Sequence, residues 1–229
     1  MGRIFDLDSP VSRFLSRMAD LIWLNILTII CCIPIVTIGA SLTALNYVAL
    51  KMVRNEDGYI RESFFKSFKQ NFKQATIIWL IILGVLILLI CDFYIIRIAP
   101  ALFPSWIKVV LFAVTMVLLI ATMHVFPVLA KFENSIKNTF KNSLLMGILS
   151  LPKTILMIIC WIIPVVIALL FYQILPLVLA LGMSLPTYMC AQLYNKTFKR
   201  FEPEEVQTAD DEWTLLPEEE GQETDGVER

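Results

Sequence analysis

Residues 18–50 read MADLIWLNILTIICCIPIVTIGASLTALNYVAL, an apolar block of 33 residues with Pro34 near its middle. A straight helix of this length would measure about 50 Å, whereas the hydrocarbon core of a bilayer is only about 30 Å thick. Proline removes a backbone hydrogen bond and clashes with the preceding helical turn. The block therefore either crosses the membrane as one tilted, kinked helix or turns back at residues 33–39.

The composition is that of a membrane protein. Of the 229 residues, 58% are hydrophobic and the mean hydropathy is +0.73, whereas soluble domains are about 45–50% apolar. The net charge of −1 hides a strong segregation of charge. Residues 1–201 carry 18 basic and 8 acidic side chains, while residues 202–229 carry 12 acidic side chains and one basic side chain.

The chain divides into three parts on this pattern. Residues 1–17 are expected to form an N-terminal interfacial amphipathic helix, because Ser9 and Pro10 are typical of a helix start and apolar residues follow at helical spacing. Residues 18–200 are expected to form the helical membrane domain. Residues 201–229 are acidic and poor in apolar residues, which predicts a disordered cytoplasmic tail.

The fold class expected is all-α, a polytopic transmembrane helical bundle with five to six membrane segments and cytoplasmic amphipathic helices. A weak internal repeat relates FKQN, which starts at Phe68, to FKNS, which starts at Phe140. The repeat indicates either a parallel duplication or a chance similarity of amphipathic helices. The membrane segments are expected at about 18–33, 38–53, 75–96, 107–130, 154–172 and 177–194.

The distribution of Lys and Arg predicts the topology, because these residues concentrate in cytoplasmic loops. Loop 51–74 has six of them and loop 131–153 has four, whereas loop 97–108 has two and turn 173–176 has none. This predicts a multi-pass protein of the cytoplasmic (plasma) membrane with both basic loops and the C-terminus in the cytoplasm. The three N-terminal arginines also favour the cytoplasm, and a hairpin in the block that starts at residue 18 satisfies this preference.

Polar and small residues in the first block are candidates for a site. Exposed backbone at membrane depth beside hydroxyl and amide groups is a common way for transporters to bind ligands. The competing interpretation is structural: an interfacial carboxylate, an amide bonded to a neighbouring helix, and small residues that let helices pack closely. The candidates are Asp20, Asn25, Pro34, Thr37, Gly39, Thr43 and Asn46.

A basic, aromatic stretch comes after the first block. Its aromatic and lysine residues alternate at helical spacing, which favours an interfacial helix on anionic lipid headgroups. A docking surface for a cytoplasmic partner is the alternative. The residues concerned are Phe64, Phe65, Lys66, Phe68, Lys69, Phe72 and Lys73.

No motif in the sequence indicates catalysis or a cofactor. HExxH, GxSxG, phosphate-loop and Rossmann patterns are all missing from the sequence. The five cysteines lie in apolar blocks without a CxxC pair, and a single histidine argues against a histidine-based zinc site. The chain is therefore expected to be no enzyme, with no metal and no cofactor. Its basic loops flank membrane segments, which argues against nucleic acid as a partner.

Four stretches together resemble a known family. They are DLIWLN from Asp20, IPIVTIGA from Ile33, TAL from Thr43 and FFKSFKQNFKQA from Phe64. Their order and spacing resemble the YesL-like family of bacterial membrane proteins, a domain-of-unknown-function family. The resemblance implies no established activity and no site residues. Genes of that family often lie beside carbohydrate uptake transporters, which implies an accessory role in sugar uptake.

Two functions are left as hypotheses. The first is a non-enzymatic accessory or interaction subunit associated with carbohydrate uptake, with the lipid bilayer around it and a sugar-transporter membrane complex as its partner. The alternative is a small membrane transporter with its site at the helix break of residues 34–46. The oligomeric state is open.

Overall fold

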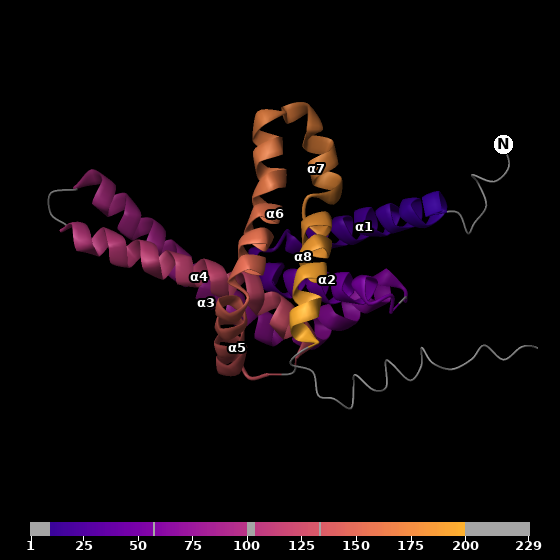
Figure 1. Ribbon diagram of the computed structural model, residues 1–229, viewed down its shortest axis with the longest axis horizontal. Coiled ribbons are helices and arrows are strands. Elements are labelled where there is room, and N and C mark those ends of the chain that lie inside the picture. The colour runs from indigo at the N-terminus through magenta and orange to yellow at the C-terminus, as the bar shows by residue number, and fades with distance from the viewer. Residues whose placement is uncertain (1–9, 57, 100–103, 133, 200–229) are drawn as a thin grey trace, which may run out of the picture.

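The computed structural model describes residues 10–56, 58–99, 104–132 and 134–199, and within these ranges it contains helices and no strands. The predicted all-α fold is confirmed (Figure 1). Residues 1–9 and the acidic tail from residue 201 lie outside the described residues, so the expectations for them are not addressed. The elements are α1 (Pro10–Cys32), η1 (Ile35–Thr37), α2 (Ile38–Val53), α3 (Ile60–Ile98), α4 (Ser105–Lys131), α5 (Ile136–Leu149), α6 (Leu151–Leu170), η3 (Tyr172–Ile174), α7 (Leu175–Leu181) and α8 (Ser184–Phe198).

Helix α2 lies at the centre of the bundle, where it packs against α1, α3, α4 and α8. In its apolar stretch 61% of the residues are buried, against 28% or less in the other long helices. Small residues explain this position, because Gly39, Ala40, Ala44 and Ala49 are all buried and allow neighbouring helices to approach closely. Three apolar clusters form the core, and each contains residues of α2.

The first apolar block folds back on itself. Arg17, in the first half of α1, donates hydrogen bonds to the Met52 carbonyl oxygen (3.2 Å) and to Asn55 Oδ1 (3.3 Å), both at the C-terminal end of α2. Helix α1 ends at Cys32, since Ile33 precedes Pro34 and a residue before proline disfavours helical geometry. Both ends of the block therefore lie at one end of the bundle, and the hairpin that the charge distribution favoured is confirmed.

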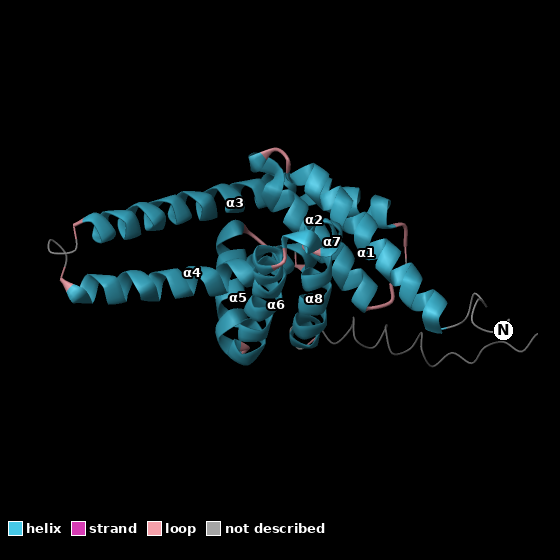
Figure 2. Cartoon of the chain, turned by 90° about the horizontal axis from the view of Figure 1, so that it is seen from above, coloured by secondary structure: helices cyan, strands magenta, loops and turns pink. Residues whose placement is uncertain are grey.

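Helix α3 runs without interruption through 39 residues, a length of about 58 Å. Its first half lies along α2, and its second half continues beyond the bundle (Figure 2). Residues 60–83 contain neither proline nor glycine, so nothing in the backbone separates the basic stretch from the apolar stretch. The segment expected at 75–96 is thus the second part of a longer helix.

Two apolar arms leave the centre of the molecule in different directions. The distal parts of α3 and α4 form one arm, and α6 with α7 forms the other (Figures 1 and 2). Where α4 returns to the bundle, Val125, Phe126 and Leu129 are buried against α2 and α3. Farther out, large apolar side chains of both arms are exposed. Lipid is the natural solvent for such a surface.

The last membrane segment differs from the prediction. The sequence predicts one helix at 177–194, but the structure has α7 and α8, which are bent by 46° relative to each other. Gly182 lies at the break, and a Cβ atom there would collide with the Val178 carbonyl oxygen. Pro186 falls in the first turn of α8, where a proline does not cost a helical hydrogen bond.

Five helices of the described chain are long and apolar enough to cross a membrane, and the bent pair α7–α8 would make a sixth. The five are α1 from Val11, η1 with α2, α3, α4 and α6. These features fit a multi-pass membrane protein. Which membrane contains the protein, and on which side the C-terminus lies, stay predictions.

The two copies of the sequence repeat occupy related positions. Phe68 and Phe140 pack against the same apolar cluster of α2, α3 and α4. Seven residues after each phenylalanine, Ala75 and Gly147 each lie where a neighbouring helix approaches closely. The copies differ beyond these positions, because α3 continues to Ile98 whereas α5 ends at Leu149. A duplication stays a prediction that the related positions favour.

The fold-back predicts from which side of the membrane three positions can be labelled. In a cysteine-free background, Ser16→Cys and Glu56→Cys should react with a membrane-impermeant maleimide from the same side, because α1 starts where α2 ends. Val36→Cys, exposed in the turn, should react only from the opposite side. Labelling of all three positions from one side would contradict a crossing of the membrane by α1 and α2.

Candidate functional site

At the break between α1 and α2, side chains of the protein donate hydrogen bonds to backbone carbonyl groups. The Thr37 hydroxyl lies 2.6 Å from the Cys31 carbonyl oxygen and 2.8 Å from that of Pro34, and it donates to one or the other. The Trp79 indole Nε1 donates to the Ile35 carbonyl oxygen at 2.8 Å. Carbonyl groups that the break frees are thus bonded inside the protein. Pro34 itself is exposed, in an extended conformation.

Gly39 brings α2 against the backbone of α3. A Cβ atom at this position would collide with the Ala75 carbonyl oxygen and would lie 2.6 Å from Trp79 Cβ. The Thr43 hydroxyl donates to the Gly39 carbonyl oxygen at 2.9 Å, one turn back on the same helix. Both residues therefore serve the packing of α2, which favours the structural interpretation of this part of the candidate site.

Asn25 holds the break between α7 and α8. Its side chain is fully buried, and its Nδ2 donates to the Leu179 carbonyl oxygen at 2.6 Å. Its Oδ1 accepts hydrogen bonds from the backbone N–H groups of Met183 and Ser184, both at 3.0 Å. One amide side chain thus satisfies three backbone groups that a helix break leaves without helical partners. The sequence prediction of a bond to a neighbouring helix is confirmed.

Asn46 joins α2 to α8. Its Nδ2 donates to the Leu42 carbonyl oxygen at 2.8 Å, and its Oδ1 accepts from the Tyr194 hydroxyl at 3.3 Å. Asn46 also lines a cavity of about 210 Å³ that is otherwise mostly apolar, with Trp79 and Met157 among its walls. Both polar atoms of the amide are therefore used within the bundle.

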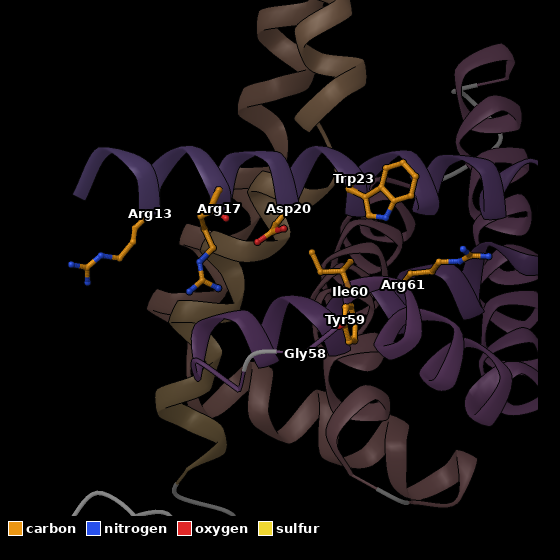
Figure 3. Close-up of a pocket in the computed structure, with 9 residues that line it drawn as sticks. Arg13, Arg17, Asp20, Trp23, Gly58, Tyr59, Ile60 and Arg61 are labelled. Atoms are coloured by element: carbon orange, nitrogen blue, oxygen red, sulfur yellow. The ribbon is translucent and has the colours of Figure 1, made fainter. Parts of the chain in front are cut away.

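Asp20 lies in a different environment, a wide cavity of about 590 Å³ between α1 and the turn that leads into α3. Figure 3 shows Arg17 and Asp20 pointing from α1 toward this turn. The cavity is rich in guanidinium groups, which distinguishes it from the apolar interior. Its lining residues are Arg13, Ser16, Arg17, Asp20 and Trp23 from α1, with Gly58, Tyr59, Ile60 and Arg61 from the turn and α3.

The basic, aromatic stretch has one edge inside the protein and one edge outside. Phe64 is fully buried against α1 and α2, and Phe65 and Phe68 pack partly against the same cluster. Phe64 therefore does not lie on lipid headgroups, because α2 covers it. Contact of the outer edge with headgroups stays a prediction. The exposed side chains of this edge are Lys66, Lys69, Phe72 and Lys73.

The sequence does not indicate which residues are the hydrogen-bond partners of the polar groups around the candidate site. Trp79 is half-buried, and nothing in the sequence indicates that its indole N–H bonds the Ile35 carbonyl oxygen across 44 residues. Arg54 Nε donates to Asn195 Oδ1 at 3.0 Å, which links the end of α2 to α8. Such pairs join residues far apart in the chain, so local spacing carries no signal for them.

The candidate residues do not converge on one centre. Thr37, Gly39 and Asn46 follow α2, Asn25 bonds α7 and α8, and Asp20 faces the arginine-rich cavity. Within the described residues, no three or more His, Cys, Asp or Glu side chains are grouped so that they could hold a metal ion. The arrangement around the break supports helix packing, whereas the arginine-rich cavity brings several charged side chains together.

Comparison with known families adds one finding. Residues 21–93 match the model of the family described as "Protein of unknown function, DUF624". The match contains the fold-back, Asn25, Gly39 and most of α3. No curated protein and no solved structure matches the chain. The match supports a domain-of-unknown-function family for this part of the chain and assigns no activity.

Proposed function

We propose that the protein is a non-enzymatic accessory subunit of another complex in the cytoplasmic membrane, associated with carbohydrate uptake. The observation that carries this proposal is the α3–α4 arm, which leaves the bundle with apolar side chains exposed around it (Figure 2). Leu86, Ile87 and Leu88 are consecutive and all exposed, Leu88 at 66%. Since consecutive helical residues point about 100° apart, the arm is open on more than one side.

A partner helix fits this arm better than lipid alone at one position. Gly84 lies in the arm, and a Cβ atom there would meet no atom within 4 Å. Membrane helices associate through close packing at small residues, because lipid tails provide no hydrophobic drive between helices. Gly84 thus offers a place where another helix can approach the backbone of α3.

The carbohydrate association rests on the resemblance to the YesL-like family, which covers roughly residues 1–200 and is most specific in residues 20–75. The two basic loops and the tail would supply further contacts on the cytoplasmic side, which the charge distribution favours. The non-enzymatic role is supported by the buried amides, since Asn25 and Asn46 use their polar atoms for helix packing.

The transporter alternative has less support in the geometry. A transport site at residues 34–46 needs polar groups that are open to a ligand. Here Thr37, Ser41, Thr43 and Asn46 each donate to a backbone carbonyl oxygen of this chain. The hydroxyl and amide donors of the break are thus engaged, and the accessory function is the better proposal.

Site-specific photo-crosslinking in native membranes tests the proposal. A photoreactive residue at Leu88 or Val110, both exposed on the α3–α4 arm, should form a covalent product with a membrane subunit of a sugar uptake transporter. A photoreactive residue at Leu169, exposed on the other arm, is the matched control and should yield much less of this product.

The substitution Gly84→Leu should also lower recovery of that subunit when the protein is purified in mild detergent, because the added side chain blocks the approach. The proposal fails if neither arm position yields a product with a transporter subunit, or if Gly84→Leu leaves its recovery unchanged.

A further inference from the structure

We propose that the arginine-rich cavity between α1 and the α2–α3 turn binds the phosphate group of an anionic phospholipid. The cavity has a volume of about 590 Å³. It is formed by the first half of α1 on one side and by Gly58, Tyr59, Ile60 and Arg61 on the other (Figure 3). This inference is independent of the accessory function, which concerns the opposite end of α3.

The charge of the cavity favours an anion. Three arginines line it, Arg13, Arg17 and Arg61, against a single carboxylate from Asp20. Guanidinium groups bind phosphate through paired N–H donors and are weakly hydrated, which suits a site at a membrane surface. Arg17 also donates to Met52 and Asn55, so it positions the cavity wall while it contributes positive charge.

The start of α3 adds to the attraction for phosphate. Helix α3 begins at Ile60 in the wall of the cavity, and Tyr59 before it makes no capping hydrogen bond with its side chain. The first N–H groups of a helix lack partners within the helix, and the helix dipole places partial positive charge there. Arg61 and the helix start therefore favour the same sign of ligand charge, and Glu62 in the first turn of α3 offsets part of it.

The surface next to the cavity suits an acyl chain, which distinguishes a phospholipid from free phosphate. Trp23 lines the cavity, and Ile26 and Ile30 come next on α1 at spacings of three and four residues, so the three lie on one face of the helix. All three are exposed apolar side chains. A headgroup in the cavity can thus extend its acyl chain along α1 into the hydrocarbon region.

Native mass spectrometry of the purified full-length chain in a nonionic detergent tests the proposal. One equivalent of 1-palmitoyl-2-oleoyl-phosphatidylglycerol should bind more tightly than the zwitterionic phosphatidylcholine with the same chains. The double variant Arg13→Gln/Arg61→Gln should weaken phosphatidylglycerol binding about 30-fold, since each basic residue near an anionic lipid contributes on the order of fivefold. Arg17 is left unchanged because it also holds the fold-back.

The matched control is Arg97→Gln/Lys108→Gln, which removes the same charge from exposed positions at the far end of the α3–α4 arm, outside the cavity. It should leave the affinity within about twofold, and circular dichroism and size exclusion should show both double variants folded. If both double variants lose the same affinity for phosphatidylglycerol, the assignment of the lipid to this cavity is overturned. Equal binding of phosphatidylcholine, which carries the same phosphodiester with an added positive charge, would overturn the preference for an anionic phospholipid. If inorganic phosphate competes as strongly as the lipid, the site binds free phosphate, and the assignment of a phospholipid as the ligand is overturned.

Discussion

Alanine at position 39 should lower the free energy of unfolding by about 2 kcal/mol or more, since overpacking of a tight contact costs about 1–3 kcal/mol. The added methyl group would collide with the Ala75 carbonyl oxygen, which belongs to the backbone of α3 and cannot rotate away. Helices α2 and α3 would have to separate at the centre of the molecule. Thermal unfolding of the purified protein in detergent, followed by circular dichroism, measures the effect.

Gly84→Ala provides the matched control for this substitution. Both glycines lie in long helices, but a Cβ atom on Gly84 would meet nothing within 4 Å. The control should change the free energy of unfolding by no more than about 0.5 kcal/mol, as for other surface substitutions. If both alanine variants unfold at the same temperature, the close approach of α2 and α3 at Gly39 is wrong.

Asn25→Ala should lower the free energy of unfolding by about 2–4 kcal/mol, because three hydrogen bonds from a fully buried amide to backbone groups are lost together. The Leu179 carbonyl and the N–H groups of Met183 and Ser184 would lose their side-chain partner at the break between α7 and α8. We expect faster hydrogen exchange of the Met183 and Ser184 amides as well, which mass spectrometry of peptides from this region measures.

Two further variants test whether the lost hydrogen bonds cause the destabilisation of Asn25→Ala. Asn25→Asp, which is neutral when fully buried, keeps the oxygen that accepts from Met183 and Ser184 and can donate its O–H to Leu179, so it should destabilise less than alanine. Thr28→Val lies one turn away and is also buried, but it removes only a bond to Leu24 on the same helix. It should cost under about 1 kcal/mol. An equal cost for Thr28→Val and Asn25→Ala would show that burial alone, and not the bridge, matters.

Much of the helical architecture could be predicted from local properties of the sequence. Apolar runs of membrane length indicated the long helices, and Pro34 marked the end of α1 because the residue before a proline disfavours helical geometry. The charge distribution favoured the hairpin that the bond from Arg17 to Met52 confirms. The break between α7 and α8 escaped prediction, since residues 177–194 are largely apolar and Gly182 alone is a weak signal.

The candidate site was predictable only in part. Asn25 and Asn46 stand out because amides are costly in an apolar helix and need partners. Their partners could not be deduced, because Leu179 and Tyr194 lie about 150 residues away along the chain. Asp20 was expected to be an interfacial carboxylate, but the cavity that it lines also needs Tyr59 from the α2–α3 turn and Arg61 from α3.

The sequence by itself determined that this is a helical membrane protein whose first apolar block cannot be one straight span. Those conclusions depend on hydrophobicity, length and proline chemistry, which act within a few residues. The tertiary structure alone decided that the Pro34 break is closed by Trp79 and Thr37, and that Asn25 holds α7 to α8. The reason is physical: backbone groups freed at a break inside a membrane must find partners, and the nearest partner in space can belong to any helix.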